Sequence, residues 1–296
     1  MSVKHPVIAV TGSSGAGTTT VKNAFEHIFF REKINPLIVE GDSYHQYDRA
    51  SMKQAIDKFA SEGKQLSHFG PDANHFDTLA ETFKTYGSTG MCQRRYYLHS
   101  EEEATEHNAR LNTDLTPGMF TPWEEIKEET DLLFYEGLHG GVVDGDVDVA
   151  EHTDLLVGVV PIVNLEWIQK IHRDNAQRGY SADAIVDTIL RRMDDYVHFI
   201  TPQFSKTDIN FQRVPTVDTS NPFIARDIPT PDESFIVIRF RDPTSVDFPY
   251  LLNMISDSFM SRPNTIVVPG GKMGFAMELV LNPVIHDLIQ QKRKVK

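Results

Sequence analysis

Short runs of consecutive apolar residues alternate along the chain with longer segments of helical periodicity. The apolar runs predict strands at residues 7–10, 37–39, 131–135 and 154–160. Apolar residues at helical spacing predict helices at about 18–31, 51–62, 75–86, 165–177 and 181–197. Continuous apolar runs are typical of parallel strands buried on both faces. The alternation therefore predicts an α/β protein built from strand–helix–strand units.

The rest of the pattern is less regular. Strands are predicted at 214–217, 235–240 and 265–268 around a helix near 250–260, and an amphipathic helix closes the chain. The segment 91–130 carries two acidic stretches, several threonines and two prolines, without clear periodicity. We expect this segment to be a long surface excursion from a single domain that spans residues 1–296.

Composition limits the partners and the compartment. The 296 residues have a formal net charge of −13, which disfavours nucleic acid as a ligand because its phosphates require clustered Lys and Arg. A single cysteine, Cys92, permits no intramolecular disulfide and no zinc site that needs several thiolates. No apolar stretch reaches the roughly 18 residues of a membrane helix, and the N-terminus lacks a signal-peptide pattern. We expect a cytoplasmic protein with neither nucleic acid nor a membrane as partner.

A glycine-rich segment follows the first predicted strand and leads into the first predicted helix. It consists of Gly12, Ser13, Ser14, Gly15, Ala16, Gly17, Thr18 and Thr19. Its glycine spacing is that of a P-loop, whose backbone N–H groups bind nucleotide phosphates. It differs from the G-x-G-x-x-G fingerprint of dinucleotide-binding proteins. We therefore expect ATP at this loop, with the hydroxyl of Thr19 as a ligand of Mg²⁺.

Thr18 stands where the usual P-loop motif has a lysine. Without that lysine, the β- and γ-phosphates lack their customary cation. The alternative interpretation is a turn of small residues that serves only close packing between a strand and a helix. Because the segment lies between a strand and a helix, as a P-loop requires, we retain the phosphate-binding interpretation and predict a replacement cation from elsewhere in the chain.

The second predicted strand ends in polar residues, at the edge where open α/β sheets bind ligands. Asp42 can accept the proton of an attacking hydroxyl there, although an aspartate at such a position is equally suited to capping a turn or helix. His45, Arg49 and Lys53 follow and can hold a phosphorylated acceptor. For His45 taken alone, a surface or core histidine is the simpler interpretation.

Glu136 lies at the carboxyl end of the strand predicted at 131–135. In a P-loop enzyme, a carboxylate at this position can hold Mg²⁺. The residues that follow, His139, Gly140 and Gly141, would also fit the oxyanion loop of a hydrolase. The Gly-x-Ser-x-Gly motif of such hydrolases occurs nowhere in the chain, which argues against this alternative.

The helix predicted at 165–177 carries charged residues at four-residue spacing. Lys170, Asp174 and Arg178 project from one face, with Arg173 nearby. An ordinary solvated ladder of salt bridges would give the same spacing. However, the helix follows a buried strand directly, and Lys170 is a candidate for the cation that is missing at position 18.

Taken together, these segments resemble the bacterial type of phosphoribulokinase over essentially the whole chain. The matching residues are 12–19, 40–42 with His45 and Arg49, 134–139, 163–174, 210–215 and 217–222. The resemblance implies a P-loop NTPase fold with a mixed, mostly parallel sheet flanked by helices. It also implies the Calvin-cycle reaction, in which ATP phosphorylates D-ribulose 5-phosphate to ribulose 1,5-bisphosphate.

The resemblance also assigns roles to individual residues. Asp42 would be the base, Glu136 would lie on the metal side, and three residues of one helix would take part in catalysis: Lys170, Arg173 and Asp174. The sugar phosphate would be bound by a basic set: His45, Arg49, Lys53, Arg173 and Arg178. Lys170 would replace the lysine of the P-loop.

Regulation is a further implication of the resemblance. Bacterial members are commonly homo-oligomers activated by NADH, and Arg31, Arg239 and Arg262 would be the effector-binding arginines. Ala16 occupies the position of a regulatory cysteine in plant-type enzymes, so we do not expect thioredoxin control. The alternatives are a related kinase for another sugar or nucleoside, and a nucleotide-binding regulator without catalysis, which only Thr18 supports.

Overall fold

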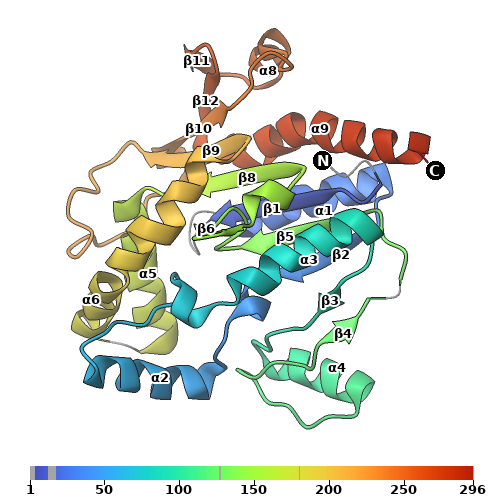
Figure 1. Ribbon diagram of the computed structural model, residues 1–296. Helices are drawn as coiled ribbons and strands as arrows, with labels where there is room; N and C mark the ends of the chain where they lie inside the picture. Colours follow the sequence, from blue (N-terminus) through green and yellow to red (C-terminus); the bar gives the residue numbers. More distant parts are fainter. Residues whose placement is uncertain (1–3, 13–17, 127, 180, 296) are drawn as a thin grey trace.

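The computed structural model describes residues 4–12, 18–126, 128–179 and 181–295. An eight-stranded sheet runs through its centre in the order β11–β12–β10–β9–β8–β1–β5–β2 (Figure 1). The five parallel strands are β2 (Pro36–Glu40), β5 (Leu132–Gly137), β1 (Val7–Gly12), β8 (Leu155–Val160) and β9 (Ile209–Pro215). Three antiparallel strands continue the sheet: β10 (Ser234–Phe240), β12 (Thr265–Pro269) and β11 (Phe259–Arg262). The predicted mixed, mostly parallel sheet is confirmed.

Helices cover both faces of this sheet. On one face, α1 (Thr18–Glu32), α8 (Phe248–Met254) and α9 (Met273–Val295) bury an apolar cluster that includes Phe25, Phe134 and Met277. On the other face, α3 (Phe76–Thr89) packs against a cluster that includes Phe83 and Tyr135. Every residue of β1 is buried, because its two sets of side chains enter both clusters.

Three helices follow the carboxyl ends of parallel strands, where the site is expected. α2 (Arg49–Ser61) comes after β2, and α5 (Val163–Arg178) with α6 (Ala182–Arg191) comes after β8 (Figure 1). The helix predicted at 181–197 is in fact divided, because α6 ends at Arg191 and is followed by α7 (Met193–Asp195) and a π-helical turn at 196–200. No helix in the described part of the chain is long and apolar enough to cross a membrane.

Several predicted elements differ from the structure. The excursion at 91–130 contains α4 (Glu101–Leu111) and a small sheet of β3 (Gln93–Arg94) and β4 (Glu124–Glu125), and a hairpin of β6 (Val143–Asp144) and β7 (Val147–Asp148) also escaped prediction. The strand predicted at 214–217 is wrong in position, because pairing with β8 places β9 at Ile209–Pro215. The helix predicted near 250–260 ends at Met254. Residues 259 and 260, which the prediction placed in that helix, belong to the edge strand β11.

Candidate active site

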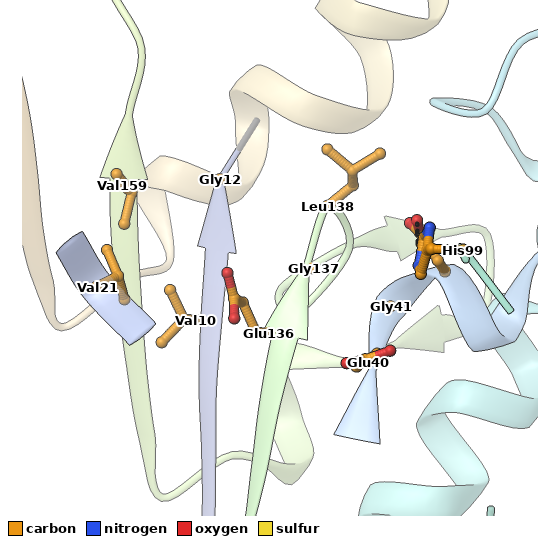
Figure 2. A pocket seen from close by; sticks show the side chains of 11 residues that line it. Val10, Gly12, Val21, Glu40, Gly41, His99, Glu136, Gly137, Leu138 and Val159 are labelled. Carbon is orange, nitrogen blue, oxygen red and sulfur yellow. Dashed lines mark ion pairs between the residues drawn. The ribbon is translucent and has the colours of Figure 1, made fainter. Parts of the chain in front are cut away.

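Two adjoining cavities lie at the carboxyl ends of the parallel strands. The first is lined by Gly12 of β1, Glu40 of β2 and Glu136 of β5 (Figure 2). The second has a volume of about 640 Å³, within the range of small-molecule sites, and is lined by residues of α2, α5 and the excursion. Asp42 and His99 line both cavities, so they stand at the junction between a strand-end site and a basic site.

Asp42 lies in a 3₁₀ turn, Gly41–Tyr44, that follows β2 directly. Gly41 permits this close approach, because a Cβ atom there would lie 2.8 Å from the Cα atom of Gly137. The Asp42 carboxylate is contacted by two imidazoles: Oδ1 lies 3.3 Å from His45 Nε2, and Oδ2 lies 3.7 Å from His99 Nε2. The N-cap of α2 is a different aspartate, Asp48, whose side chain accepts a hydrogen bond from Ser51 N–H.

The environment of Asp42 favours its charged form. Burial raises the pKa of the carboxyl, but the hydrogen bond from His45 and the charges of His45, His99 and His68 outweigh burial and lower this pKa to about 2. The side chain nevertheless remains 44% exposed towards the cavities. Asp42 is therefore an accessible carboxylate that is ionised throughout the neutral range.

Asn74 fixes the protonation of His45. The amide nitrogen of Asn74 donates to the carbonyl oxygens of His68 and Gly70, so its Oδ1 faces His45 Nδ1 at 2.7 Å. Nδ1 must then carry a hydrogen, and Nε2 can donate to the Asp42 carboxylate only if it is protonated too. The geometry therefore places the His45 ring between the Asn74 amide oxygen and the Asp42 carboxylate. The ring of His68 packs on His45 at 4.4 Å, and burial, followed by the charges of His45 and Arg192, lowers the pKa of His68 to about 3.

Helix α5 brings three of the expected residues together. Lys170 Nζ donates to Asp174 Oδ2 at 2.5 Å, and Arg173 Nε donates to Asp174 Oδ1 at 3.2 Å. Asp174 is only 3% exposed, while Lys170 and Arg173 line the second cavity. Burial raises the pKa of Asp174, but the hydrogen bond and charge of Lys170, with Arg173, lower it overall. This cluster is therefore buried against the cavity, unlike a solvated salt-bridge ladder.

The remaining acceptor-side residues are placed differently from one another. Arg49 begins α2 and lines the second cavity, whereas Lys53, one turn further along this helix, is exposed. The side chain of Arg178 lies outside the described part of the chain. Arg192, which follows α6, adds a cation to the cavity lining.

Glu40 and Glu136 are partners in the register of β2 and β5, at the strand ends of the first cavity (Figure 2). Burial raises the pKa of Glu136; Lys22 lowers it, and the nearby charges of Glu40 and Asp42 raise it further. Within the described residues, no group of three or more His, Cys, Asp and Glu side chains is arranged to hold a metal. The carboxylates fit Mg²⁺, which typically takes one or two protein carboxylates and completes its shell with phosphate oxygens and water.

Part of the predicted phosphate loop can be located. Gly12 ends β1, and a Cβ atom there would lie 2.7 Å from the carbonyl oxygen of Val159, so β8 requires a glycine at this position. Ser13, Ser14, Gly15, Ala16 and Gly17 lie outside the described residues. Thr18 and Thr19 begin α1, and their side chains are likewise outside the description.

The three expected effector arginines occupy two places. Arg31 donates to Asn282 Oδ1 at 2.9 Å and lies 3.5 Å from Glu278, which joins α1 to α9. Arg239 of β10 and Arg262 of β11 are both exposed and both pair in register with Thr265 of β12. They therefore lie at the same level of the sheet on either side of β12.

Sequence reasoning missed several residues of the site. His99, Asn74, Glu40 and Arg192 all contact the junction or line the cavities. Only Glu40 carried a usable signal, since it ends the second strand. The others reach the site from segments distant in sequence, and an isolated histidine or asparagine there has no spacing that would mark it.

Comparisons with known proteins find a matching family and similar relatives. Residues 7–220 match the family model described as "Phosphoribulokinase / Uridine kinase family". The chain is 59% identical over 295 residues to the phosphoribulokinase of Xanthobacter flavus, covering 99% of both proteins. It is 56% identical to that of Sinorhizobium medicae, covering 100% of both. A solved structure of phosphoribulokinase from Rhodobacter spheroides matches with a TM-score of 0.89 and 52% identity, over 99% of this chain and 100% of that one.

Proposed function

The chain belongs to the phosphoribulokinase/uridine kinase family, and from this membership we propose that it uses ATP to phosphorylate D-ribulose 5-phosphate. The products are ADP and ribulose 1,5-bisphosphate. One observation carries the assignment of the site: Asp42 lines the same cavity as the cations Arg49, Lys170 and Arg173. A base and a basic site for a phosphorylated acceptor therefore stand side by side.

In the proposed reaction, the C1 hydroxyl oxygen attacks the γ-phosphorus of ATP while the bond to the β-phosphate oxygen breaks in line with it. The hydroxyl proton passes to the carboxylate of Asp42. His45 keeps that carboxylate ionised and oriented through its 3.3 Å contact. Lys170 and Arg173 stabilise the charge on the transferred group, and Asp174 holds both of them in place.

The acceptor phosphate is assigned to the basic wall of the second cavity, where Arg49 and Arg192 supply charge. His45 and Lys53 complete the proposed acceptor-binding set, together with Arg173 and Arg178. Glu136 and Thr19 are the proposed protein ligands of Mg²⁺, which would neutralise charge on the phosphates of ATP. Lys170 is proposed to supply the cation that Thr18 lacks.

Assembly and regulation remain predictions. We infer a homo-oligomer with NADH as an effector. The shared register of Arg239 and Arg262 supports their use as one anion-binding pair. Arg31 lies in a separate ion pair with Glu278, so its participation would require that pair to open or a second subunit to approach. Cytoplasmic localisation is likewise a prediction.

A coupled assay of ADP release across several acceptors tests the proposal. We expect turnover with D-ribulose 5-phosphate far above that with uridine or pantothenate, because the cavity cations bind a phosphorylated acceptor. Its preference over other sugar phosphates is expected from the similarity to phosphoribulokinases. A preference for uridine would assign the other branch of the family. ATP binding without release of ADP for any acceptor would indicate a regulator.

A further inference from the structure

Arg95, a residue of the excursion at 91–130, packs against the turn that carries Asp42. Arg95 follows β3, and its guanidinium makes two short hydrogen bonds to backbone carbonyl oxygens. Nε donates to the oxygen of Ser43 at 2.6 Å, and a terminal nitrogen donates to the oxygen of His45 at 2.6 Å. Both acceptors lie within three residues of Asp42 along the chain.

Two aromatic rings of the excursion hold the guanidinium of Arg95. Its central carbon lies 3.9 Å from the ring centre of Phe120 and 4.8 Å from that of Trp123. Backbone hydrogen bonds between residues 96–98 and 118–121 bring Phe120 into place. A planar guanidinium stacked in this way is pre-organised to donate in a fixed direction, which a flexible ammonium group is not.

Contacts of Tyr44 also hold this turn in place. Tyr44 donates from its hydroxyl to Thr82 Oγ1 at 3.0 Å and packs edge-on against Trp123, which secures the turn to α3 and to the excursion. The carbonyls that flank Tyr44 are those that Arg95 binds. Arg95 therefore holds the backbone on both sides of Tyr44, next to Asp42 and His45.

We propose that Arg95 is a positioning residue for the acceptor side of the site, an inference that rests on the proposed function. It acts through the backbone of residues 43–45, and it is not among the residues that line the two cavities in the described structure. The excursion thereby takes part in positioning the base and its histidine partner.

The test compares Arg95→Met and Arg95→Lys with a matched control, Arg110→Gln. Arg110 belongs to the same excursion and pairs with Glu124 at 2.7 Å, so its loss reports on a general loosening of the segment. We expect Arg95→Met to lower kcat/KM for D-ribulose 5-phosphate about 10- to 100-fold while the KM for ATP stays unchanged. Arg95→Lys should recover part of the loss, and Arg110→Gln should resemble the wild type.

Hydrogen exchange supplies a readout that does not depend on turnover. The amides of residues 41–46 should exchange faster in Arg95→Met than in the wild type, and should be unchanged in Arg110→Gln. If Arg95→Met fails to fold, the same comparison is made with Arg95→Lys. A wild-type protein without ribulose 5-phosphate turnover would contradict the proposed function, while the exchange measurement would still test the role of Arg95.

Two results would overturn the inference. One is wild-type kcat/KM in folded Arg95 variants with unchanged exchange in residues 41–46. The other is an equal loss of activity and of melting temperature in Arg95→Met and Arg110→Gln, which would show that only the integrity of the excursion matters.

Discussion

The Oδ1 atom of Asp42 lies 3.3 Å from Nε2 of His45, whose other ring nitrogen is held by Asn74. This arrangement lowers the pKa of Asp42 to about 2, so the carboxylate is ionised at neutral pH and binds a proton only weakly. A weak base suits phosphoryl transfer, because the loose transition state develops before the hydroxyl must lose its proton. Asp42 would therefore contribute through its position as well as its basicity.

Replacing the base should abolish most of the activity without unfolding the protein. Asp42→Asn keeps the shape of the side chain but removes its proton affinity, so we expect kcat to fall by a factor of about 10² to 10⁴. Affinity for ATP should persist. Steady-state kinetics of Asp42→Asn check this expectation. The matched control is Asp57→Asn, which changes an exposed aspartate of α2. A folded Asp42→Asn enzyme with near-normal kcat would eliminate Asp42 as the base.

Removing the imidazole should change the pH dependence of the reaction. In His45→Gln the burial that raises the pKa of Asp42 remains, while the largest opposing interaction is lost. The pKa of Asp42 should therefore rise, and the carboxyl should become protonated, and inactive, at a higher pH. We expect the acidic limb of the kcat/KM profile to move upwards in pH, and to move less in His99→Gln because that contact is longer, at 3.7 Å. Identical limbs in the wild type and His45→Gln would refute this coupling.

Lys170 should be required for turnover as the replacement cation. We expect Lys170→Met to lower kcat by about 10² to 10³, the usual loss when one group that stabilises transition-state charge is removed, and to weaken ATP binding. The protein should also melt at a lower temperature, since the buried Asp174 would lose its 2.5 Å contact with the Lys170 ammonium group.

Lys206→Met is the matched control for Lys170, because Lys206 pairs with Asp148 at 2.5 Å away from the cavities. It should lose some stability but little activity. If Lys170→Met left ATP affinity and turnover unchanged, Lys170 would not be the cation that replaces the P-loop lysine missing at position 18.

A buried neutral histidine should make the fold sensitive to acid. His139 is 3% exposed, and its Nε2 donates a hydrogen bond to the carbonyl oxygen of Phe69 at 3.1 Å. Burial, followed by the charge of His45, lowers its pKa to about 3 from an ordinary value of 6.5. Between these values the unfolded chain binds a proton that the native protein does not, so stability falls as pH falls, by up to about 1.4 kcal/mol per pH unit.

Urea unfolding at a series of pH values measures this slope in the wild type and in His139→Gln. The variant should show a shallower loss of unfolding free energy between pH 6.5 and 4.5. Equal slopes would mean that His139 is protonated in the native state.

The parallel part of the fold was predictable because its strands are buried on both faces and therefore read as unbroken apolar runs, as in 7–10 and 154–160. Strand β9 was misplaced because Asn210 and Gln212 interrupt its apolar pattern, and only pairing with β8 reveals it. Helix α4 escaped prediction because it is largely polar; its start depends on a local cap, in which Ser100 accepts from Glu103 N–H.

The site could be predicted only where its residues follow a strand or share a helix face. Asp42 follows the end of β2, Glu136 lies at the end of β5, and Lys170 and Asp174 are one helical turn apart, so their positions in the sequence made them candidates. His99 and Arg95 reach the site from the excursion through tertiary packing, which leaves no periodic trace in the sequence.

The most direct test of the proposed activity is the identity of the product formed from ATP and D-ribulose 5-phosphate by the purified protein. Phosphorus NMR of the reaction mixture should show ADP and ribulose 1,5-bisphosphate appearing in equal amounts, and Asp42→Asn should form both about 10² to 10⁴ times more slowly. No bisphosphate, or ADP formed at the same rate without the sugar phosphate, would contradict the account.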